Sequence, residues 1–231
     1  MGQSLAKQLG QPQGFLSRFA ALFFTWNNDS NTKWVISELN VQPGAKVLVI
    51  GFGTGTDIAA FVERVGPTGM VYGIEISEDM LRIASERHRE SIEKGLVKLE
   101  IADAQHLDVS QYPKFDYIFH SNVVYFWDDP VRVYSHLSQF LVKKEEAEEE
   151  ILKEDETGER EAEGNDVDHS NGKIVSCVVR ETAMTRLATR HFKRHGVDDA
   201  TKIEQYCEEA KLIRVKSDTN SRVTYVIHSV L

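Results

Sequence analysis

Residues 47 to 55 read Val-Leu-Val-Ile-Gly-Phe-Gly-Thr-Gly, an apolar run that leads directly into glycines at alternate positions. An unbroken apolar run is typical of a parallel strand that is covered on both faces. Glycines let main-chain N–H groups approach a ligand closely because no Cβ stands in the way. A helix expected from about Thr56 would point its positive N-terminal end toward the same place. The stretch therefore predicts a buried strand followed by a ligand-binding loop.

A second apolar strand indicates what kind of ligand the loop binds. Val71-Tyr72-Gly73-Ile74 ends in Glu75, and a carboxylate at the tip of a second parallel strand is the usual partner of ribose hydroxyls. A dinucleotide fingerprint needs glycines at its first, third and sixth positions, but the sixth position here is Thr56. This departure argues against a nicotinamide oxidoreductase, which stays as a rival interpretation.

The spacing Gly-x-Gly-x-Gly resembles the first motif of the class I S-adenosylmethionine-dependent methyltransferases. Three later segments are similar to further motifs of that family in the same order: Ile101-Ala102-Asp103-Ala104, residues 115 to 122 and residues 123 to 130. The resemblance covers roughly residues 40 to 142, and a weaker similarity resumes at Gly172. It implies an α/β fold: a Rossmann-like, mostly parallel seven-stranded sheet with an antiparallel C-terminal edge strand and helices on both faces.

The resemblance also implies S-adenosyl-L-methionine as cofactor, methyl transfer to a small-molecule acceptor by in-line displacement, and a set of site residues. The expected cofactor-binding residues are Gly51, Phe52, Gly53, Gly55, Glu75, Ile76, Asp103, Ala104 and Asn122. The expected substrate contacts are Tyr125, Trp127 and Arg186, with a packing role as the alternative for Trp127. His120 is the candidate general base, with a structural hydrogen-bonding role as the alternative.

One position departs from the family pattern. The family usually carries an acidic residue two positions before the first glycine, and this chain has Val49 there. Either another group substitutes for it, or cofactor binding is weakened or lost. The alternative function is therefore a catalytically silent methyltransferase-like protein that binds or regulates a partner through an acidic insertion.

That insertion accounts for the charge of the chain. Residues 144 to 168 contain thirteen Asp or Glu residues against Lys144, Lys153 and Arg160. Their net charge is therefore −10, whereas the net charge of the whole chain is −9. The near-neutral remainder argues against a nucleic-acid surface. A segment so rich in Glu has too little apolar surface to offset the cost of ordering, which predicts disorder. The interaction expected for this acidic segment is the binding of a protein partner.

The 231 residues are expected to form a single methyltransferase domain, 1–231. Its predicted parts are N-terminal capping helices at 1–43, a core at 44–143 and 172–231, and the acidic insertion at 144–171. The capping helices would cover the cofactor, pack on the sheet edge or lie on a membrane surface. No apolar run is long enough to span a bilayer, and Cys177 and Cys207 lack disulfide or metal-ligand patterns, so a cytoplasmic protein is expected.

The expected elements alternate between strands and helices, which predicts right-handed crossovers. Strands are predicted at 46–51, 70–76, 97–102, 115–121, 172–179, 211–217 and 222–230, and helices at 56–65, 78–93, 129–142 and 199–210. A cluster of basic residues between Arg180 and His195 would receive an anionic substrate, dock the acidic insertion or form a solvated helix face. His191 and His195 lack further ligands, so no metal site is predicted.

Overall fold

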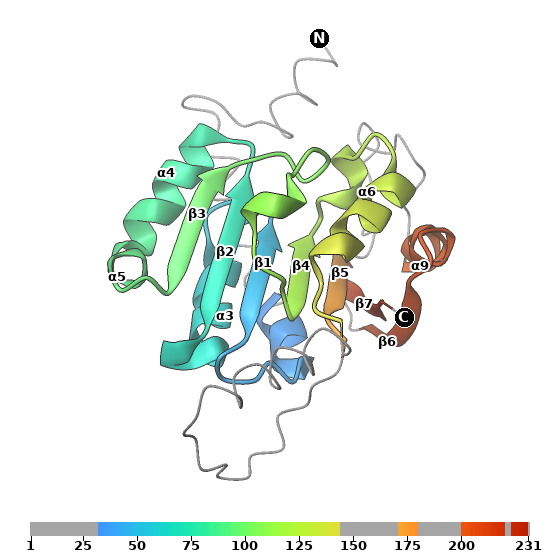
Figure 1. Ribbon diagram of the computed structural model, residues 1–231, viewed down its shortest axis with the longest axis horizontal. Coiled ribbons are helices and arrows are strands. Elements are labelled where there is room, and N and C mark those ends of the chain that lie inside the picture. Colours follow the sequence, from blue (N-terminus) through green and yellow to red (C-terminus); the bar gives the residue numbers. More distant parts are fainter. Residues whose placement is uncertain (1–31, 144–170, 180–199, 220–222, 231) are drawn as a thin grey trace.

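The computed structural model describes residues 32–143, 171–179, 200–219 and 223–230. Within them seven strands form one sheet in the order β3-β2-β1-β4-β5-β7-β6 (Figure 1). The strands are β1 (Lys46–Ile50), β2 (Met70–Glu75), β3 (Val97–Ile101), β4 (Tyr117–Ser121), β5 (Lys173–Val179), β6 (Ile213–Thr219) and β7 (Val223–Ser229). The first five pair in parallel, as the alternation of strands and helices predicts.

The C-terminal strands add an antiparallel hairpin at one side of the sheet. β7 pairs antiparallel with β5 from Lys173 to Val179, and β6 pairs antiparallel with β7. The Rossmann-like fold class is confirmed, with one difference in detail: β6 is the edge strand and the C-terminal β7 lies inside it. A link of only three residues, 220–222, joins β6 to β7, and so short a connection permits antiparallel pairing alone.

Besides the helix of residues 32–38, the described residues contain five α-helices: α3 (Thr56–Val65), α4 (Glu78–Arg87), α5 (Arg89–Glu93), α6 (Pro130–Leu137) and α9 (Ala200–Glu209). The sequence predicts α3 with the bounds that the structure has. The helix expected at 78–93 is interrupted at His88, whose backbone leaves the helical region at φ −105° and ψ 18°. The helix expected at 129–142 ends at Leu137 and continues as the short 3₁₀ turn η4 (Ser138–Phe140). These breaks divide two predicted helices into shorter pieces.

Side-chain caps explain where two of these helices begin. The Ser77 hydroxyl accepts a hydrogen bond from the Met80 N–H at the start of α4. The Asp129 carboxylate accepts one from the Arg132 N–H, 3.0 Å away, at the start of α6, and Pro130 occupies the first helical position. Such caps satisfy N–H groups that have no partner within the helix.

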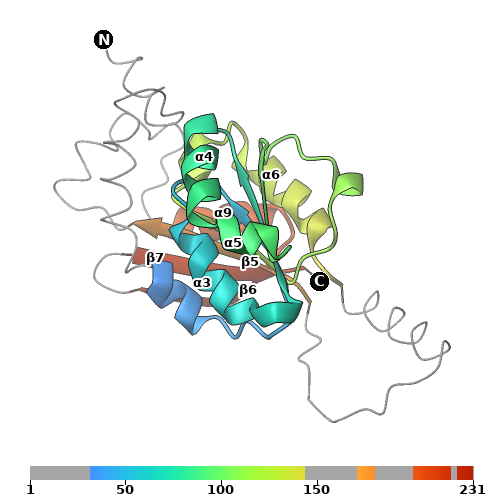
Figure 2. The same ribbon diagram turned by 90° about the vertical axis from the view of Figure 1, so that its left-hand side faces the viewer.

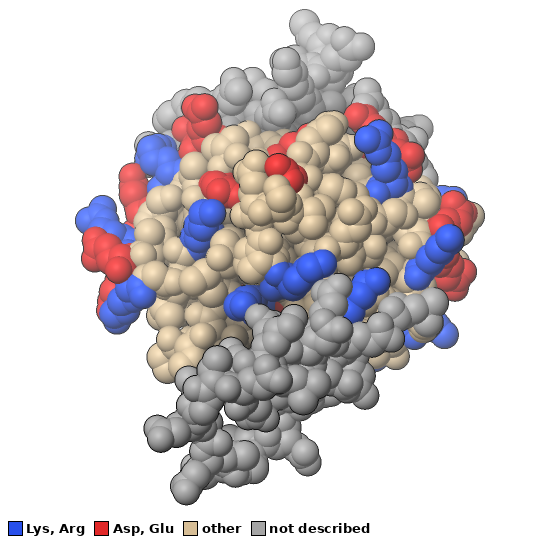
Figure 3. Space-filling view, in the orientation of Figure 1, with Lys and Arg blue, Asp and Glu red and all other residues tan. Residues whose placement is uncertain are grey.

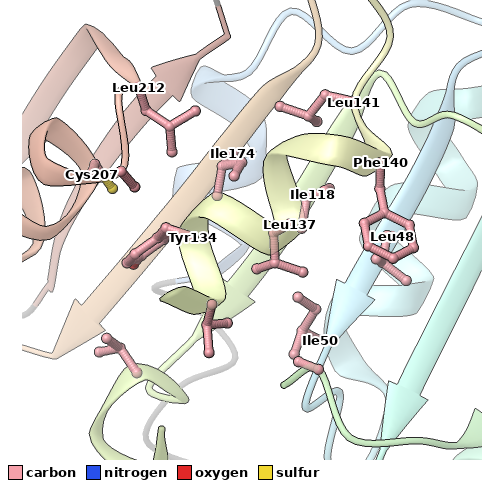
Figure 4. Close-up of a cluster of buried hydrophobic side chains, with 14 of the residues drawn as sticks. Leu48, Ile50, Ile118, Tyr134, Leu137, Phe140, Leu141, Ile174, Cys207 and Leu212 are labelled. Carbon is pink, nitrogen blue, oxygen red and sulfur yellow. The ribbon is translucent and has the colours of Figure 1, made fainter. Parts of the chain in front are cut away.

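Helices cover both faces of the sheet, so the core has two layers. One apolar cluster lies beneath α6 and α9 and contains Leu48, Ile118 and Ile174 of three neighbouring strands (Figure 4). The other contains Val49 and Phe119 and is covered by α3, α4 and the helix of residues 32–38. Figure 2 shows α3 and α6 on opposite sides of the sheet. Strand residues that alternate between the two layers read as continuous apolar runs in the sequence.

The part of the capping region that is described packs on the sheet. Val35, Ile36 and Leu39 are buried in the cluster beneath α3, and the Trp34 ring meets the Tyr225 ring edge to face at 5.4 Å. The predictions for residues 1–31, the acidic insertion and the basic cluster with Arg186 lie outside the described residues. On the face that carries α6, charged side chains of both signs are scattered among uncharged ones (Figure 3).

Candidate functional site

Parallel pairing brings the ends of four strands to one edge of the sheet. Ile50 at the end of β1 is in register with Ile74 of β2 and His120 of β4, and Glu75 is in register with Ile101 of β3. The loops that follow these strands therefore lie side by side, where open α/β sheets bind their ligands. Among the described residues, every site residue expected from the sequence lies in or beside these loops.

The three glycines of the loop after β1 all have left-handed backbone angles, with φ 65° at Gly51, 53° at Gly53 and 81° at Gly55. Residues with a Cβ rarely adopt such angles, so conformation alone explains the alternate spacing. Space is also short at Gly51, where an added Cβ would lie 2.6 Å from a methyl group of Val123. At Gly53 an added Cβ would meet nothing within 4 Å. The centre of the loop is therefore open to a ligand.

Phe52 sits between the first two glycines but turns its side chain inward. Its ring is 3% exposed and belongs to the cluster beneath α3. The main chain of the loop is held by bonds from the Gly51 N–H to the Ile74 carbonyl at 2.8 Å and from the Gly55 N–H to the Phe52 carbonyl at 2.9 Å. Phe52 can therefore contact a ligand through its main chain only.

Glu75 lies at the centre of the site and is 8% exposed. Its carboxylate accepts hydrogen bonds from the N–H groups of Gly53 at 3.0 Å, Ile76 at 2.8 Å and Ser77 at 3.1 Å. Burial raises the pKa of this carboxyl above its ordinary value, and the three N–H donors offset that effect only in part. The fold thus holds a carboxylate where its ionised form is costly, which is common at functional sites.

The segment after β3 places two expected residues in different surroundings. Ala104 is buried in the cluster beneath α6, so its main chain is the part available to a ligand. The Asp103 carboxylate stays partly exposed, accepts a bond from the Gln105 N–H at 3.0 Å and lies 3.1 Å from Nδ1 of His106. Ile76, 40% exposed, offers an apolar surface beside Glu75. This edge suits a flat heteroaromatic ring with a polar margin.

Asn122 follows β4 in a left-handed conformation, φ 58°, which is uncommon for a residue other than glycine. Its N–H donates to the Cys177 carbonyl at 2.9 Å, and its amide Nδ2 donates to the Ser121 hydroxyl at 3.1 Å. Backbone strain of this kind gathers at functional sites, where the surroundings hold it in place. Val123, the next residue, is the one that closes over Gly51.

His120 is fully buried rather than open to an acceptor. Its Nε2 lies 3.1 Å from the Tyr134 hydroxyl, which in turn lies 2.9 Å from the Ser176 hydroxyl. Burial lowers the pKa of His120 to about 3, so the ring is neutral and a weak base. A general base must reach the proton that it removes, and this geometry favours the structural role over the catalytic one.

Trp127 also packs inside the protein. It is 3% exposed and meets the rings of His120 and Tyr134 edge to face at 4.9 and 5.2 Å. Its surroundings favour packing over a substrate contact. The main chain of Tyr125 lies in the 3₁₀ turn η3 (Val124–Phe126), beside the site.

Val49 is fully buried within the cluster beneath α3. An apolar side chain therefore occupies the position at which the family usually carries an acidic residue. Asp57, in the first turn of α3, is the nearest carboxylate along the chain to the glycine loop. It lies close enough to Cys177 to act on the pKa of that thiol.

Two residues that the sequence did not single out connect parts of the site. Nε2 of His88 lies 2.6 Å from the Gly55 carbonyl oxygen. The Gln105 side-chain oxygen accepts a bond from the Asp128 N–H at 2.9 Å and so joins the loop after β3 to the loop after β4. Both contacts span many residues of sequence, and no local pattern marks them. The break of the predicted helix at His88 is the one signal, and it is visible only in the fold.

The described residues lack two kinds of feature. They contain no group of three or more His, Cys, Asp or Glu side chains arranged to hold a metal ion. In the same residues, no helix combines the length and the apolar character needed to cross a membrane.

The fold and the site define a Rossmann-like protein with a glycine-rich loop at the carboxyl ends of its parallel strands, and a comparison with protein families identifies the class. Residues 42–227 match the family described as "Methyltransferase domain", and the chain belongs to that family. The class predicted from the sequence, an S-adenosylmethionine-dependent methyltransferase, is confirmed.

Curated relatives match short parts of the chain. A ubiquinone/menaquinone biosynthesis C-methyltransferase UbiE of Cupriavidus pinatubonensis is 41% identical over 75 residues, which are 32% of this chain and 30% of that protein. The Burkholderia mallei protein of the same name is 44% identical over 64 residues, 28% of this chain and 25% of its own length. The chain thus matches less than a third of the length of these relatives.

Solved structures of similar fold match most of the chain at low identity. A SAM-dependent methyltransferase from Aquifex aeolicus has a TM-score of 0.63 at 14% identity, and the match covers 100% of this chain and 99% of that one. Geranyl diphosphate C-methyltransferase from Streptomyces coelicolor has a TM-score of 0.63 at 12% identity, covering 98% and 87%. At such identities these matches show the fold alone.

Proposed function

We propose that this protein transfers a methyl group from S-adenosyl-L-methionine to a small-molecule acceptor. The observation that carries the proposal is the placement of Glu75. Its carboxyl group is held at the end of β2 by three N–H groups, one of them from the open glycine loop. Burial makes that carboxylate costly for the fold, so its retention is best explained by a ligand with hydroxyl donors.

The residues of this edge fit the nucleoside half of the cofactor. Glu75 would accept hydrogen bonds from the two ribose hydroxyls, and Ile76 would pack against one face of the adenine. Asp103 would accept from the adenine amino group, with the main chain of Ala104 beside it. The left-handed glycines leave the space above Gly53 free of side chains, which suits the close approach of ribose and methionine.

The methionine end needs a partner for its ammonium group. Val49 offers none because its side chain is apolar and buried. We assign this contact to Asp57, with Asn122 at the end of β4 as a second polar candidate, because Asp57 is the single acidic residue between Val47 and Ile58. In this assignment the first turn of α3 supplies the charge that most family members carry at the end of the first strand.

When bound, the cofactor supplies a methyl group on a sulfonium, which is an excellent leaving group. The protein has to align the acceptor with that methyl group and to exclude water, and orientation alone supplies on the order of 7–11 kcal/mol in favourable cases. A strong base is not required for such alignment. The neutral, buried His120 is compatible with this chemistry as a support beneath the loop after β4.

The acceptor that we favour is a carbon atom of an electron-rich ring, such as a quinol. The relatives from Cupriavidus and Burkholderia are named as C-methyltransferases of ubiquinone and menaquinone biosynthesis, and 41% identity over 75 residues is the basis of the transfer. Because less than a third of those proteins is matched, the acceptor is the part of the proposal that most needs a direct test.

Two measurements test the proposal. Calorimetric titration with S-adenosylmethionine, S-adenosylhomocysteine and NAD should show binding of the two sulfur nucleosides and not of NAD. Incubation with methyl-labelled cofactor and soluble quinol analogues should then transfer label to ring carbon, with an O-methyl acceptor as control. If neither sulfur nucleoside binds, the proposal that this protein is an active methyltransferase is wrong. Binding without transfer to any acceptor would favour the catalytically silent alternative.

A further inference from the structure

The third glycine of the cofactor loop is held by a side chain from another part of the fold. Nε2 of His88 lies 2.6 Å from the carbonyl oxygen of Gly55, and the two residues are 33 positions apart. A carbonyl oxygen only accepts hydrogen bonds, so Nε2 must carry the proton and donate it. The His88 ring is 7% exposed, so water competes little for this bond.

The backbone on both sides of His88 fixes the position of the ring. The His88 N–H donates to the Ala84 carbonyl at 2.9 Å and closes α4, and the His88 carbonyl accepts from the Ile92 N–H at 2.9 Å and opens α5. The ring thus stands at the junction of two helices packed on β2 and β3. A donor anchored in this way acts as part of the scaffold rather than as a loop residue.

His88 is the closer of the two partners of the Gly55 carbonyl. The first main-chain bond of α3, from the Ala59 N–H to the same oxygen, is long at 3.4 Å. The ring also fills the space beside Gly55, because an added Cβ there would lie 2.9 Å from Nε2. His88 therefore fixes the direction of this carbonyl and adds a steric reason for glycine to the one that the backbone angle already gives.

The direction of the carbonyl fixes a second group. The Gly55 carbonyl and the Thr56 N–H belong to one planar trans peptide unit, in which they point in opposite directions. Thr56 is the first residue of α3, so its N–H has no partner within the helix. When His88 holds the carbonyl on one side, the Thr56 N–H points away from the ring, and the peptide at the start of α3 has one orientation.

We propose that His88 is a positioning residue of the cofactor loop: its bond to the Gly55 carbonyl orients the Gly55–Thr56 peptide so that the Thr56 N–H faces the methionine portion of the cofactor. This inference rests on the proposed function, since it assigns a task within the same site. His88 does not touch the reacting atoms. Its effect is on the geometry of the free loop, which the protein would otherwise have to order at the moment of binding.

The test compares two substitutions of His88 in the full chain. His88→Leu removes the donor, and His88→Gln keeps an amide N–H at a similar distance from the main chain. The dissociation constants of S-adenosylmethionine and S-adenosylhomocysteine are measured by calorimetry, with the melting temperature recorded for each variant. His88→Leu should raise both constants about threefold to tenfold, the range expected for one net hydrogen bond. His88→Gln should restore them to within about twofold of the parent protein.

Two control variants separate positioning from a general loss of stability. Arg87→Ala changes the exposed neighbour on the same helix and should leave both constants unchanged. His136→Leu removes another imidazole from a main-chain carbonyl, that of Leu107 at 2.9 Å, and touches no residue of the glycine loop. It should lower the melting temperature without changing the constants. If His88→Leu does not fold, His88→Asn, whose amide is too short to reach the carbonyl, takes its place.

The outcomes distinguish this inference from the proposed function. If the parent protein binds neither sulfur nucleoside, both are overturned. If the parent protein binds and His88→Leu binds equally well, the positioning role is wrong and the proposed function stands. The role is also wrong if His136→Leu weakens binding as much as His88→Leu does. With a methylation assay in hand, His88→Leu should raise KM for the cofactor and leave kcat within about twofold, because the bond acts before the chemical step.

Discussion

Replacing Glu75 by glutamine separates what the carboxylate does for the fold from what it does for the ligand. Glutamine has nearly the same shape and keeps one oxygen that accepts hydrogen bonds, but it removes the negative charge. The folded protein holds this charge at a net cost, because burial raises the pKa of Glu75 more than the Gly53, Ile76 and Ser77 N–H groups lower it. The charge should therefore matter more for the ligand than for stability.

The magnitudes follow from the contacts. Three N–H donors point at the carboxylate, and glutamine can serve those on one oxygen only. A lost charge-assisted bond costs about 1.5–3 kcal/mol, but relief of the buried charge offsets much of it, so Glu75→Gln should change the free energy of unfolding by less than about 1 kcal/mol. Glu75→Ala leaves all three donors without an acceptor and should cost about 2–4 kcal/mol.

Cofactor affinity should respond differently from stability, because the conservative change Glu75→Gln should already cause most of the loss of affinity. The ribose hydroxyls would lose a charged acceptor, so Glu75→Gln should raise the dissociation constant of S-adenosylhomocysteine at least about tenfold. Urea denaturation without ligand and calorimetry with ligand measure the two effects separately. Glu78→Gln, an exposed carboxylate three residues along, is the matched control and should change neither.

Two results would refute this reasoning about Glu75. Unchanged cofactor affinity in Glu75→Gln would mean that the ribose does not bind this carboxylate. A loss of more than about 2 kcal/mol of stability in the same variant, without ligand, would mean that the carboxylate is retained for the fold.

Three further predictions concern stability. Gly55→Ala should lower the free energy of unfolding by about 1–3 kcal/mol, and by more than Gly53→Ala in urea denaturation, since both residues have positive φ but only the Gly55 Cβ would strike the His88 ring, at 2.9 Å. Burial lowers the pKa of His120 to about 3 and that of His228 to about 4, so the unfolded chain takes up protons first and stability should fall as the pH drops below about 6.5. The loss of unfolding free energy should reach about 2 kcal/mol per histidine at pH 5. His228→Phe should remove the contribution of His228 to this loss, which urea denaturation of the variant and of the parent protein at pH 7 and pH 5 would measure. Deleting residues 145–170 should leave the melting temperature within a few degrees, and a large fall would contradict the assignment of this segment as an insertion.

The sequence predicted the fold well because its strands and helices follow strong periodic patterns. The run ending at Ile50 and the glycines after it mark a strand and a loop without reference to anything else in the chain. Helix α3 was predicted to the residue, since glycine precedes it and a glycine ends it. The order of β6 and β7 in the sheet was not predicted, because which strand of a hairpin pairs with β5 depends on side chains that meet across the sheet.

The sequence predicted where the expected site residues lie along the sheet better than it predicted which way their side chains point. Glu75 and Asp103 lie where the ends of parallel strands must lie, so their position follows from topology. His120 and Trp127 follow a strand that ends at the same edge, but their side chains turn into the layer beneath α6. The alternation of side chains along a strand predicts which face of the sheet each one points to. Only the packing of α6 shows that this face is closed to a ligand.

By itself the sequence determined the class of fold, the glycine loop and the nucleoside-type ligand, because each follows from local patterns of apolar residues, glycines and carboxylates. The tertiary structure alone decided that His88 holds Gly55, that Val49 is buried in the core and that His120 is fully buried. These are contacts between residues far apart in the chain or between opposite layers. They depend on how the helices pack against the sheet, and the spacing of residues along the chain does not predict them.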